Sequence, residues 1–379
     1  MPYDFDTLID RRQSDSLKWR KYAGRDVLPL WVADMDFASP PEVVAALQAR
    51  VAHGVFGYAD ATEEVVGAIL MALQRDYGWG VDPHWLIPLP GLVTGLNISC
   101  RAIGQPGDGI LTAIPVYPPF LSAPSNSERR TIPVPLKQED GHWGWDMEAT
   151  ESAVTADTRG LLLCHPHNPV GRAWTVDELN TVADFARRHD LVVISDEIHC
   201  ELLLEPGLRH TPFALLSPEA AARTITLMAP SKTYNVPGLG CGFAIISDPE
   251  LRQRFRHAMQ GIVPHNNALS YVAAAAAYRD AAPWRAELLA YLRGNRDRVM
   301  QALDGVAGLK VSKVEATYLA WIDCREAGIH NPVPFFEQAG IGLSNGLEFG
   351  APGFVRLNFG CPRGTLDEAL ARMHKALGV

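Results

Sequence analysis

Short apolar runs alternate with amphipathic stretches between residues 40 and 280. This alternation is typical of a mostly parallel sheet whose strands are connected by covering helices. The strongest strand candidates are the continuous apolar runs at residues 110–114, 160–164, 191–195, 224–228 and 242–246. We therefore expect an α/β unit in this part of the chain.

The clearest helix is predicted at residues 175–189, TVDELNTVADFARRH. Thr175 can cap the first turn, and Glu178 follows at the spacing of a capping box. Apolar residues recur at helical spacing from Leu179 to Ala186. Because this helix joins two predicted strands, it fits the crossover that a parallel pair requires.

The pattern changes after Pro264. A long helical run through NALSYVAAAAAYRD and WRAELLAYLRGNRDRVMQAL is expected to bridge to a smaller α+β unit. That unit contains candidate strands at residues 317–322 and 354–359 and a final helix at 365–377. A chain of 379 residues commonly divides into two domains. We predict a large domain at residues 45–280 and a small domain formed by residues 1–44 and 281–379.

Composition excludes several classes of function. The formal net charge is −9, from 34 basic and 43 acidic side chains, and there is no Lys/Arg block suited to nucleic acid. The N-terminus lacks the apolar core of a signal peptide, and the Ala-rich stretch near residue 275 is too short to span a bilayer. We therefore expect a cytoplasmic protein that binds neither nucleic acid nor membrane.

Metal binding is also not expected. The six cysteines are scattered without CxxC spacing, so they are interpreted as reduced and structural. His165 and His167 beside Cys164, and His199 beside Cys200, could be metal ligands, but neighbours one or two apart on strands mostly point to different faces.

Three polar residues follow predicted strands and carry the first chemical signal. Lys232 follows strand 224–228, Asp196 closes an apolar run, and Asn168 lies in the turn HNPVG. Taken singly, they have ordinary interpretations as a solvated lysine, a cap and a turn residue. Together they predict a ligand site, because the carboxyl ends of parallel strands meet at one edge of a sheet. A carboxylate there could hold a pyridinium N–H.

Further residues fit the same interpretation. In PLPGLVTGLNI, the amides of Val93 and Thr94 begin a probable helix and could bind a phosphate. Tyr117, in PVYPPF, could lie flat against an aromatic cofactor or pack in the core. Arg356 lies within an apolar strand and needs an anion, which could be a buried carboxylate or the α-carboxylate of a substrate.

The motifs GLVTGLN, PVYPPF, HNPVG, SDEIH, SKTYNVPGL and VRLNFG occur in this order over nearly the whole chain. In this respect the chain resembles the fold type I pyridoxal 5'-phosphate (PLP) enzymes of the aspartate aminotransferase superfamily. The strings WVADMDF, HGVFGY, ATYLAWID and VRLNFGCPR resemble those of one branch, the MalY/PatB-type cystathionine β-lyases, or C-S lyases. The resemblance implies PLP as the cofactor and a role in methionine biosynthesis.

The resemblance also implies roles for the matched residues. Lys232 would carry PLP as a Schiff base and later move the substrate Cα proton, with Tyr117 as a second catalytic residue stacked on the ring. The implied cofactor contacts are Asp196 at the pyridine nitrogen, Asn168 and His199 at the 3'-oxygen, and Val93, Thr94 and Ser231 at the phosphate.

Other implied roles concern the substrate and a second subunit. Arg356 and the backbone near Ala33 would bind the substrate carboxylate, and Tyr58 would reach the phosphate of a neighbouring subunit in a homodimer with shared active sites. Two positions depart from the superfamily, because Ala229 and Gly240 stand where a serine and an arginine are usual. Phosphate binding would therefore depend on other donors.

The function that the resemblance implies is α,β-elimination from L-cystathionine or related S-substituted cysteines. The expected products are a thiol (homocysteine from cystathionine), pyruvate and ammonia. A class I/II aminotransferase is the alternative, since it would use the same residues. A PLP-binding regulatory or interaction protein is a third possibility, disfavoured by the intact Lys232, Asp196 and Arg356.

Overall fold

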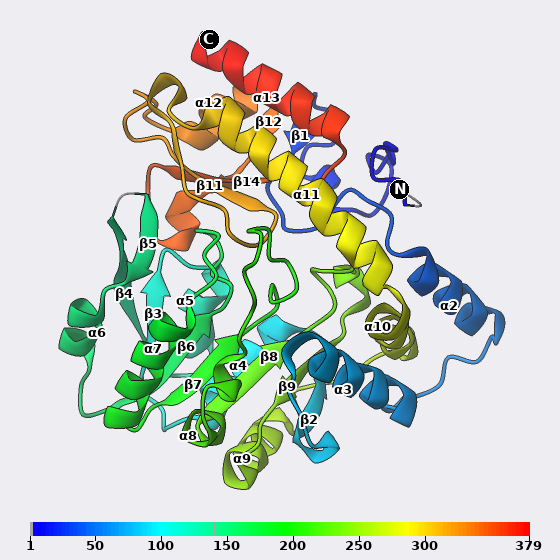
Figure 1. Cartoon of the computed structure of the whole chain (residues 1–379), viewed down its shortest axis with the longest axis vertical. Coiled ribbons are helices and arrows are strands. Elements are labelled where there is room, and N and C mark those ends of the chain that lie inside the picture. Colours follow the sequence, from blue (N-terminus) through cyan, green and yellow to red (C-terminus); the bar gives the residue numbers. More distant parts are fainter. Residues whose placement is uncertain (1–2, 140) are drawn as a thin grey trace.

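The computed structural model of the chain describes residues 3–139 and 141–379. Its centre is an eight-stranded sheet with strand order β2-β9-β8-β7-β6-β3-β4-β5 (Figure 1). The strands are β2 (Leu86–Leu89), β3 (Gly109–Ile114), β4 (Arg130–Glu139), β5 (His142–Trp145), β6 (Thr158–Cys164), β7 (Val192–Asp196), β8 (Thr224–Met228) and β9 (Gly242–Ile245).

Most of this sheet is parallel. Strands β8, β7, β6, β3 and β4 all run in one direction. The antiparallel pairs are β8 with β9, β9 with β2, and β4 with β5, all toward the two edges. The predicted mostly parallel sheet is therefore confirmed, and the five predicted strands are β3, β6, β7, β8 and β9.

Both faces of the sheet are covered, which explains why its central strands are continuously apolar. Successive side chains of a strand point to opposite faces. Accordingly Leu162 packs in a core with α4 (Leu92–Ala102) and α9 (Pro249–Met259). The next residue, Leu163, belongs to a separate core with α7 (Val176–Arg188) on the other face. This arrangement leaves the strand ends as the places where polar side chains can meet a ligand.

The predicted helix at residues 175–189 is α7 (Val176–Arg188). Its capping box is present, because the Thr175 hydroxyl accepts from the Glu178 amide and the Glu178 carboxylate accepts from the Thr175 amide. The helix connects β6 to β7, two neighbouring parallel strands, and so forms the expected crossover.

The predicted long helical run consists of two helices, α10 (Ala268–Asp280) and α11 (Ala282–Leu303). The interruption falls at Ala281, just before Pro283 in the first turn of α11. Proline has no N–H to donate and is favourable in a first turn, so the sequence restarts the helix there. Figure 1 shows α11 running from the vicinity of α13 to α10.

The remaining helices are α1 (Leu17–Arg20), α2 (Pro41–Ala52), α3 (Glu63–Tyr77), α5 (Pro118–Asn126), α6 (Met147–Ala153), α8 (Pro218–Ala222), α12 (Pro332–Gln338) and α13 (Arg363–Leu377).

A second sheet is built from the C-terminal part of the chain. Its order is β10-β11-β14-β13, and every neighbouring pair is antiparallel. Its strands are β10 (Lys310–Val311), β11 (Leu319–Asp323), β13 (Ser344–Asn345) and β14 (Phe354–Asn358). The predicted strands in this region correspond to β11 and β14.

The N-terminal segment joins this C-terminal unit. Strand β1 (Leu28–Pro29) pairs in parallel with β12 (Ile341–Gly342). This pairing supports the assignment of the first residues to the small domain, although the domain boundaries themselves stay a prediction. None of the helices in the described part of the chain is long and apolar enough to cross a bilayer.

Candidate active site

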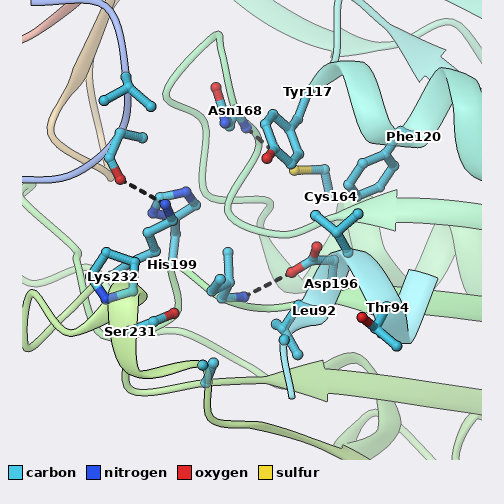
Figure 2. Close-up of a pocket in the computed structure, with 18 of the residues that line it drawn as sticks. Leu92, Thr94, Tyr117, Phe120, Cys164, Asn168, Asp196, His199, Ser231 and Lys232 are labelled. Carbon is cyan, nitrogen blue, oxygen red and sulfur yellow. Dashed lines mark hydrogen bonds between the residues drawn. The ribbon is translucent and has the colours of Figure 1, made fainter. Parts of the chain in front are cut away.

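A cavity of about 280 Å³ lies at the carboxyl ends of β6, β7 and β8. In the view of Figure 2, Tyr117 and Asn168 lie at the top, Ser231 at the bottom, and Asp196, His199 and Lys232 between them. Ten residues predicted from the sequence line this cavity: Ala33, Val93, Thr94, Tyr117, Asn168, Asp196, His199, Ser231, Lys232 and Arg356. Lining residues to which sequence reasoning assigned no role in the site are Val32, Pro90, Leu92, Phe120, Cys164, Ile198, Pro237 and Cys241.

Lys232 lies in the turn that follows β8 and is half-buried. The Nζ atom donates a hydrogen bond of 2.6 Å to the main-chain oxygen of Ala33. Burial lowers the pKa of Lys232 to about 8, and the nearby Arg356 charge acts in the same direction. The amine therefore becomes neutral far more readily than a lysine at the surface.

Asp196 is the last residue of β7 and is buried. Its Oδ1 atom accepts a hydrogen bond of 3.1 Å from the Ile198 amide. Burial raises the pKa of Asp196 to about 7. A cationic N–H placed against this carboxylate would favour its ionised form, so the position suits a partner for a protonated ring nitrogen.

Two aromatic side chains face the same space. Burial lowers the pKa of His199 to about 3, so its imidazole is neutral, and its Nδ1 atom has no hydrogen-bond partner among the described residues. Such an orphaned buried nitrogen fits contact with a ligand oxygen. Tyr117 stands just before α5, and its amide donates a bond of 3.0 Å to the Asn168 carbonyl, which joins two ligand-facing loops.

The N-terminus of α4 provides the anion-binding end of the cavity. The first hydrogen bond of this helix runs from the Gly95 amide to the Gly91 carbonyl, at 3.2 Å. The preceding amides of Val93 and Thr94 therefore have no partner within the helix. Together with the positive end of the helix dipole, they suit a phosphate.

The backbone at Gly240 explains why this chain lacks the arginine that is usual at this position in the superfamily. Its φ is +59°, and a Cβ atom added there would lie 2.7 Å from the Pro90 oxygen. A side chain would thus be strained and would collide with the loop leading into α4. Ala229 also lines the cavity and supplies no hydroxyl group. Main-chain amides and the hydroxyl groups of Thr94 and Ser231 are therefore the anion donors that the described residues offer in this part of the cavity.

Arg356 projects into the cavity from β14 and is buried. Its guanidinium donates to the Asn168 amide oxygen at 3.0 Å, the Trp31 carbonyl at 2.9 Å and the Ser344 hydroxyl at 3.2 Å. Burial lowers the pKa of Arg356 to about 10. No carboxylate among the described residues forms an ion pair with it, which disfavours the alternative of a structural carboxylate partner. A buried guanidinium of this kind is suited to a ligand carboxylate.

The segment from Val32 to Phe37 has no regular secondary structure but is held from both sides. On the side of the large sheet, the side-chain amide of Asn235 accepts from the Met35 N–H at 2.9 Å and donates to the Met35 carbonyl at 3.0 Å. From β14, the Asn358 amide nitrogen donates to the carbonyls of Val32 and Asp34. Sequence reasoning missed both asparagines, although the family-like string WVADMDF marked the segment they hold.

Tyr58 is the predicted site residue that does not line the cavity. Its side chain is fully exposed, on the segment between α2 and α3. The placement is compatible with a reach toward another subunit, and that role stays a prediction.

The described residues fit a phosphorylated pyridine aldehyde. The cavity offers a lysine with a lowered pKa, a carboxylate for a ring nitrogen, polar groups for a ring oxygen, an aromatic face, and helix amides for a phosphate. These are the groups that PLP requires of its protein.

Comparison with known proteins agrees with this fold and with these cofactor-binding groups. The chain belongs to the aminotransferase class I and II family, whose sequence model matches residues 25–373. It is a fold type I PLP enzyme, similar to C-S lyases. The cystathionine β-lyase PatB of Bacillus subtilis is 35% identical over 99% of this chain and 100% of its own.

Solved structures give the same result. The crystal structure of OvoB superposes with a TM-score of 0.97 at 48% identity, covering 99% of each chain. Cystalysin from Treponema denticola, which contains a PLP cofactor, superposes with a TM-score of 0.95 at 34% identity, covering 100% of this chain and 99% of its own. Pyridoxal 5'-phosphate is the cofactor of the present chain.

Proposed function

We propose that the protein is a carbon–sulfur β-lyase that converts L-cystathionine or a related S-substituted cysteine, with water, to a thiol, pyruvate and ammonia. With cystathionine the thiol is homocysteine. The observation that carries the proposal is the placement of one buried guanidinium, Arg356, in the same cavity as Lys232, whose amine is readily neutral. Similarity to PatB over its full length supports the choice of elimination.

The proposed roles toward the cofactor follow the positions of the side chains. Lys232 bonds covalently to PLP, and Asp196 holds the ring nitrogen in its protonated form. Asn168 and His199 contact the 3'-oxygen, and Tyr117 covers the ring. The proposed phosphate donors are the amides of Val93 and Thr94 and the hydroxyl of Ser231.

PLP, when bound, withdraws electrons from the Cα atom of an attached amino acid. Arg356 binds the substrate α-carboxylate through two parallel hydrogen bonds and thereby fixes the direction of the Cα–H bond. The neutral Lys232 amine removes the Cα proton as a general base. The electron pair left at Cα then expels the sulfur substituent from Cβ as a thiolate, which leaves as the thiol once protonated.

A class I/II aminotransferase is the runner-up, because it would use the same lysine, carboxylate and guanidinium. One feature of the cavity disfavours it. Arg356 and Lys232 are its only cationic side chains among the described residues, and Lys232 is already assigned to cofactor attachment and proton removal. A dicarboxylic amino acceptor such as 2-oxoglutarate would need a second cation, and the described residues of one chain place none in the cavity.

The direct experiment is incubation of the purified, PLP-loaded protein with L-cystathionine. Pyruvate and free thiol should appear in equal amounts, because the cleavage of one Cβ–S bond releases both. Absence of both products with cystathionine and with other S-substituted cysteines would contradict the proposed function.

We further propose a homodimer with shared active sites, in which Tyr58 contacts the phosphate bound by the other subunit. A mixture of inactive Tyr58→Ala and Lys232→Ala proteins should then regain about a quarter of wild-type activity, because random pairing makes half of the dimers hybrid and each hybrid has one intact site. The measurement is lyase activity after dissociation and reassociation of the mixed chains.

The matched control is a mixture of Lys232→Ala with Asp196→Asn. Both of these residues line the same cavity of one chain, so no hybrid contains an intact site and no activity should return. Equal recovery in the two mixtures, or activity of a strictly monomeric species, would contradict a shared site.

A further inference from the structure

Two donors compete for one oxygen atom beside the cofactor lysine. The Ala33 carbonyl accepts from Lys232 Nζ at 2.6 Å and from the Tyr318 hydroxyl at 3.0 Å. Tyr318 is buried and is not among the residues that line the cavity. The Ala33 carbonyl is therefore the group that links its hydroxyl to the lysine.

The backbone around Tyr318 holds the ring in place. Thr317 has a φ of +74° although it is β-branched and fully buried. Such a conformation is costly and persists only where the surroundings enforce it. Here the Thr317 amide donates to the Leu202 carbonyl at 2.8 Å, and the Tyr318 carbonyl accepts from the Phe359 amide at 2.9 Å.

The carbonyl is held as firmly as the ring. The Asn358 amide nitrogen binds the main-chain oxygens of Val32 and Asp34, on either side of Ala33. The oxygen of Ala33 thus cannot turn away from Tyr318 without breaking these contacts. The Ala33 carbonyl is therefore a fixed acceptor for two donors, Lys232 and Tyr318.

The effect of the hydroxyl on the lysine follows from electrostatics. A hydroxyl that donates to the Ala33 oxygen points the positive end of its dipole toward that oxygen, and so toward the Lys232 ammonium. It also draws on the acceptor capacity that the ammonium uses. Both effects disfavour the charged form of Lys232 and favour the neutral amine.

We infer that Tyr318 is a positioning residue that favours the neutral form of the Lys232 amine by sharing its acceptor, the Ala33 carbonyl. The inference rests on the proposed covalent role of Lys232. It assigns a purpose to the string ATYLAWID, which the proposed function otherwise leaves unused.

Other groups also act on the charge of Lys232 and must stay constant in a test. Arg356 on β14 disfavours the ammonium, whereas Asp34 on the N-terminal segment and Asp196 on β7 favour it. His199, after β7, is neutral and lies within range of the Lys232 charge. Tyr318→Phe removes one hydroxyl and leaves all four groups in place.

The experiment measures how fast cofactor-free, full-length protein takes up PLP between pH 6.5 and 9.5. In this step the Lys232 nitrogen forms a bond to the aldehyde carbon with loss of water, and only the neutral amine has the lone pair required. The wild-type rate should rise with pH through a midpoint near 8, the pKa to which burial lowers Lys232. In Tyr318→Phe we expect a midpoint higher by about half to one pH unit. A pKa shift of this size corresponds to the net free energy of one hydrogen bond.

The expected rates at pH 7 are about three- to tenfold lower for Tyr318→Phe than for the wild type, converging at the alkaline end. Tyr278→Phe, which removes the hydroxyl of a buried tyrosine on α10, is the control and should follow the wild type. An unchanged midpoint in Tyr318→Phe, or a rate lowered equally at every pH, would overturn the inference, since the latter indicates packing alone. The readout uses no substrate, so failure to cleave cystathionine would refute the proposed function without affecting this result.

Discussion

Lys232→Ala should lower lyase activity by at least about 10⁴-fold, the upper end of what one acid–base group contributes. The reason is that one side chain has two roles, covalent attachment of PLP and removal of the Cα proton. No other amine lines the cavity among the described residues, so none can replace it. The wild-type protein should be yellow, and borohydride should bleach the colour and fix the cofactor to the peptide that contains Lys232.

The surface provides a matched control for this change. Lys310→Ala removes an exposed lysine whose side chain forms an ion pair with Glu326, and it should leave both the activity and the borohydride adduct unchanged. A Lys232→Ala protein that still formed the same covalent adduct would show that another amine carries the cofactor.

Asp196→Asn should lower activity by about 10²- to 10³-fold, the loss typical of one preorganised electrostatic group. The amide keeps the size of the side chain but not its charge, so it cannot hold a protonated ring nitrogen and the ring withdraws electrons less strongly. The loss should appear in kcat, since Arg356 still binds the substrate carboxylate. Steady-state kinetics and the absorption spectrum of bound PLP are the measurements.

Asp190→Asn is the control for the same substitution outside the site. Asp190 is fully exposed just before β7, and its φ of +48° is one that asparagine tolerates well. This variant should behave as the wild type. If Asp196→Asn kept near wild-type kcat, the proposed contact with the ring nitrogen would be wrong.

Side chains at strand ends were predictable from the sequence. Apolar runs identified β6, β7 and β8, and parallel strands bring their carboxyl ends to one edge, so Asn168, Asp196 and Lys232 had to be neighbours. The anion requirement of Arg356 was also predictable, because a guanidinium within an apolar strand is costly without a partner.

The contacts that main-chain atoms make in the site were not predictable in the same way. The Ala33 carbonyl meets Lys232 from an irregular segment that Asn235 and Asn358 hold by hydrogen bonds. A carbonyl oxygen has no signature in the sequence. Asn358 ends the apolar strand β14, but that pattern does not reveal that its side chain binds the main-chain oxygens of Val32 and Asp34. The same limit applies to Tyr318, whose buried ring has the appearance of an ordinary core residue.

The most direct test of the central claim is the partition of products from L-cystathionine in the presence of 2-oxoglutarate. Elimination and transamination begin with the same loss of the Cα proton, so the faster of the two later steps determines the product. The thiolate is already bonded at Cβ as a good leaving group, and the cavity has a single guanidinium for carboxylates. We predict that pyruvate and thiol form over about a hundredfold faster than glutamate, which corresponds to a barrier difference of about 3 kcal/mol. Faster formation of glutamate than of pyruvate and thiol would contradict the account and identify the protein as an aminotransferase.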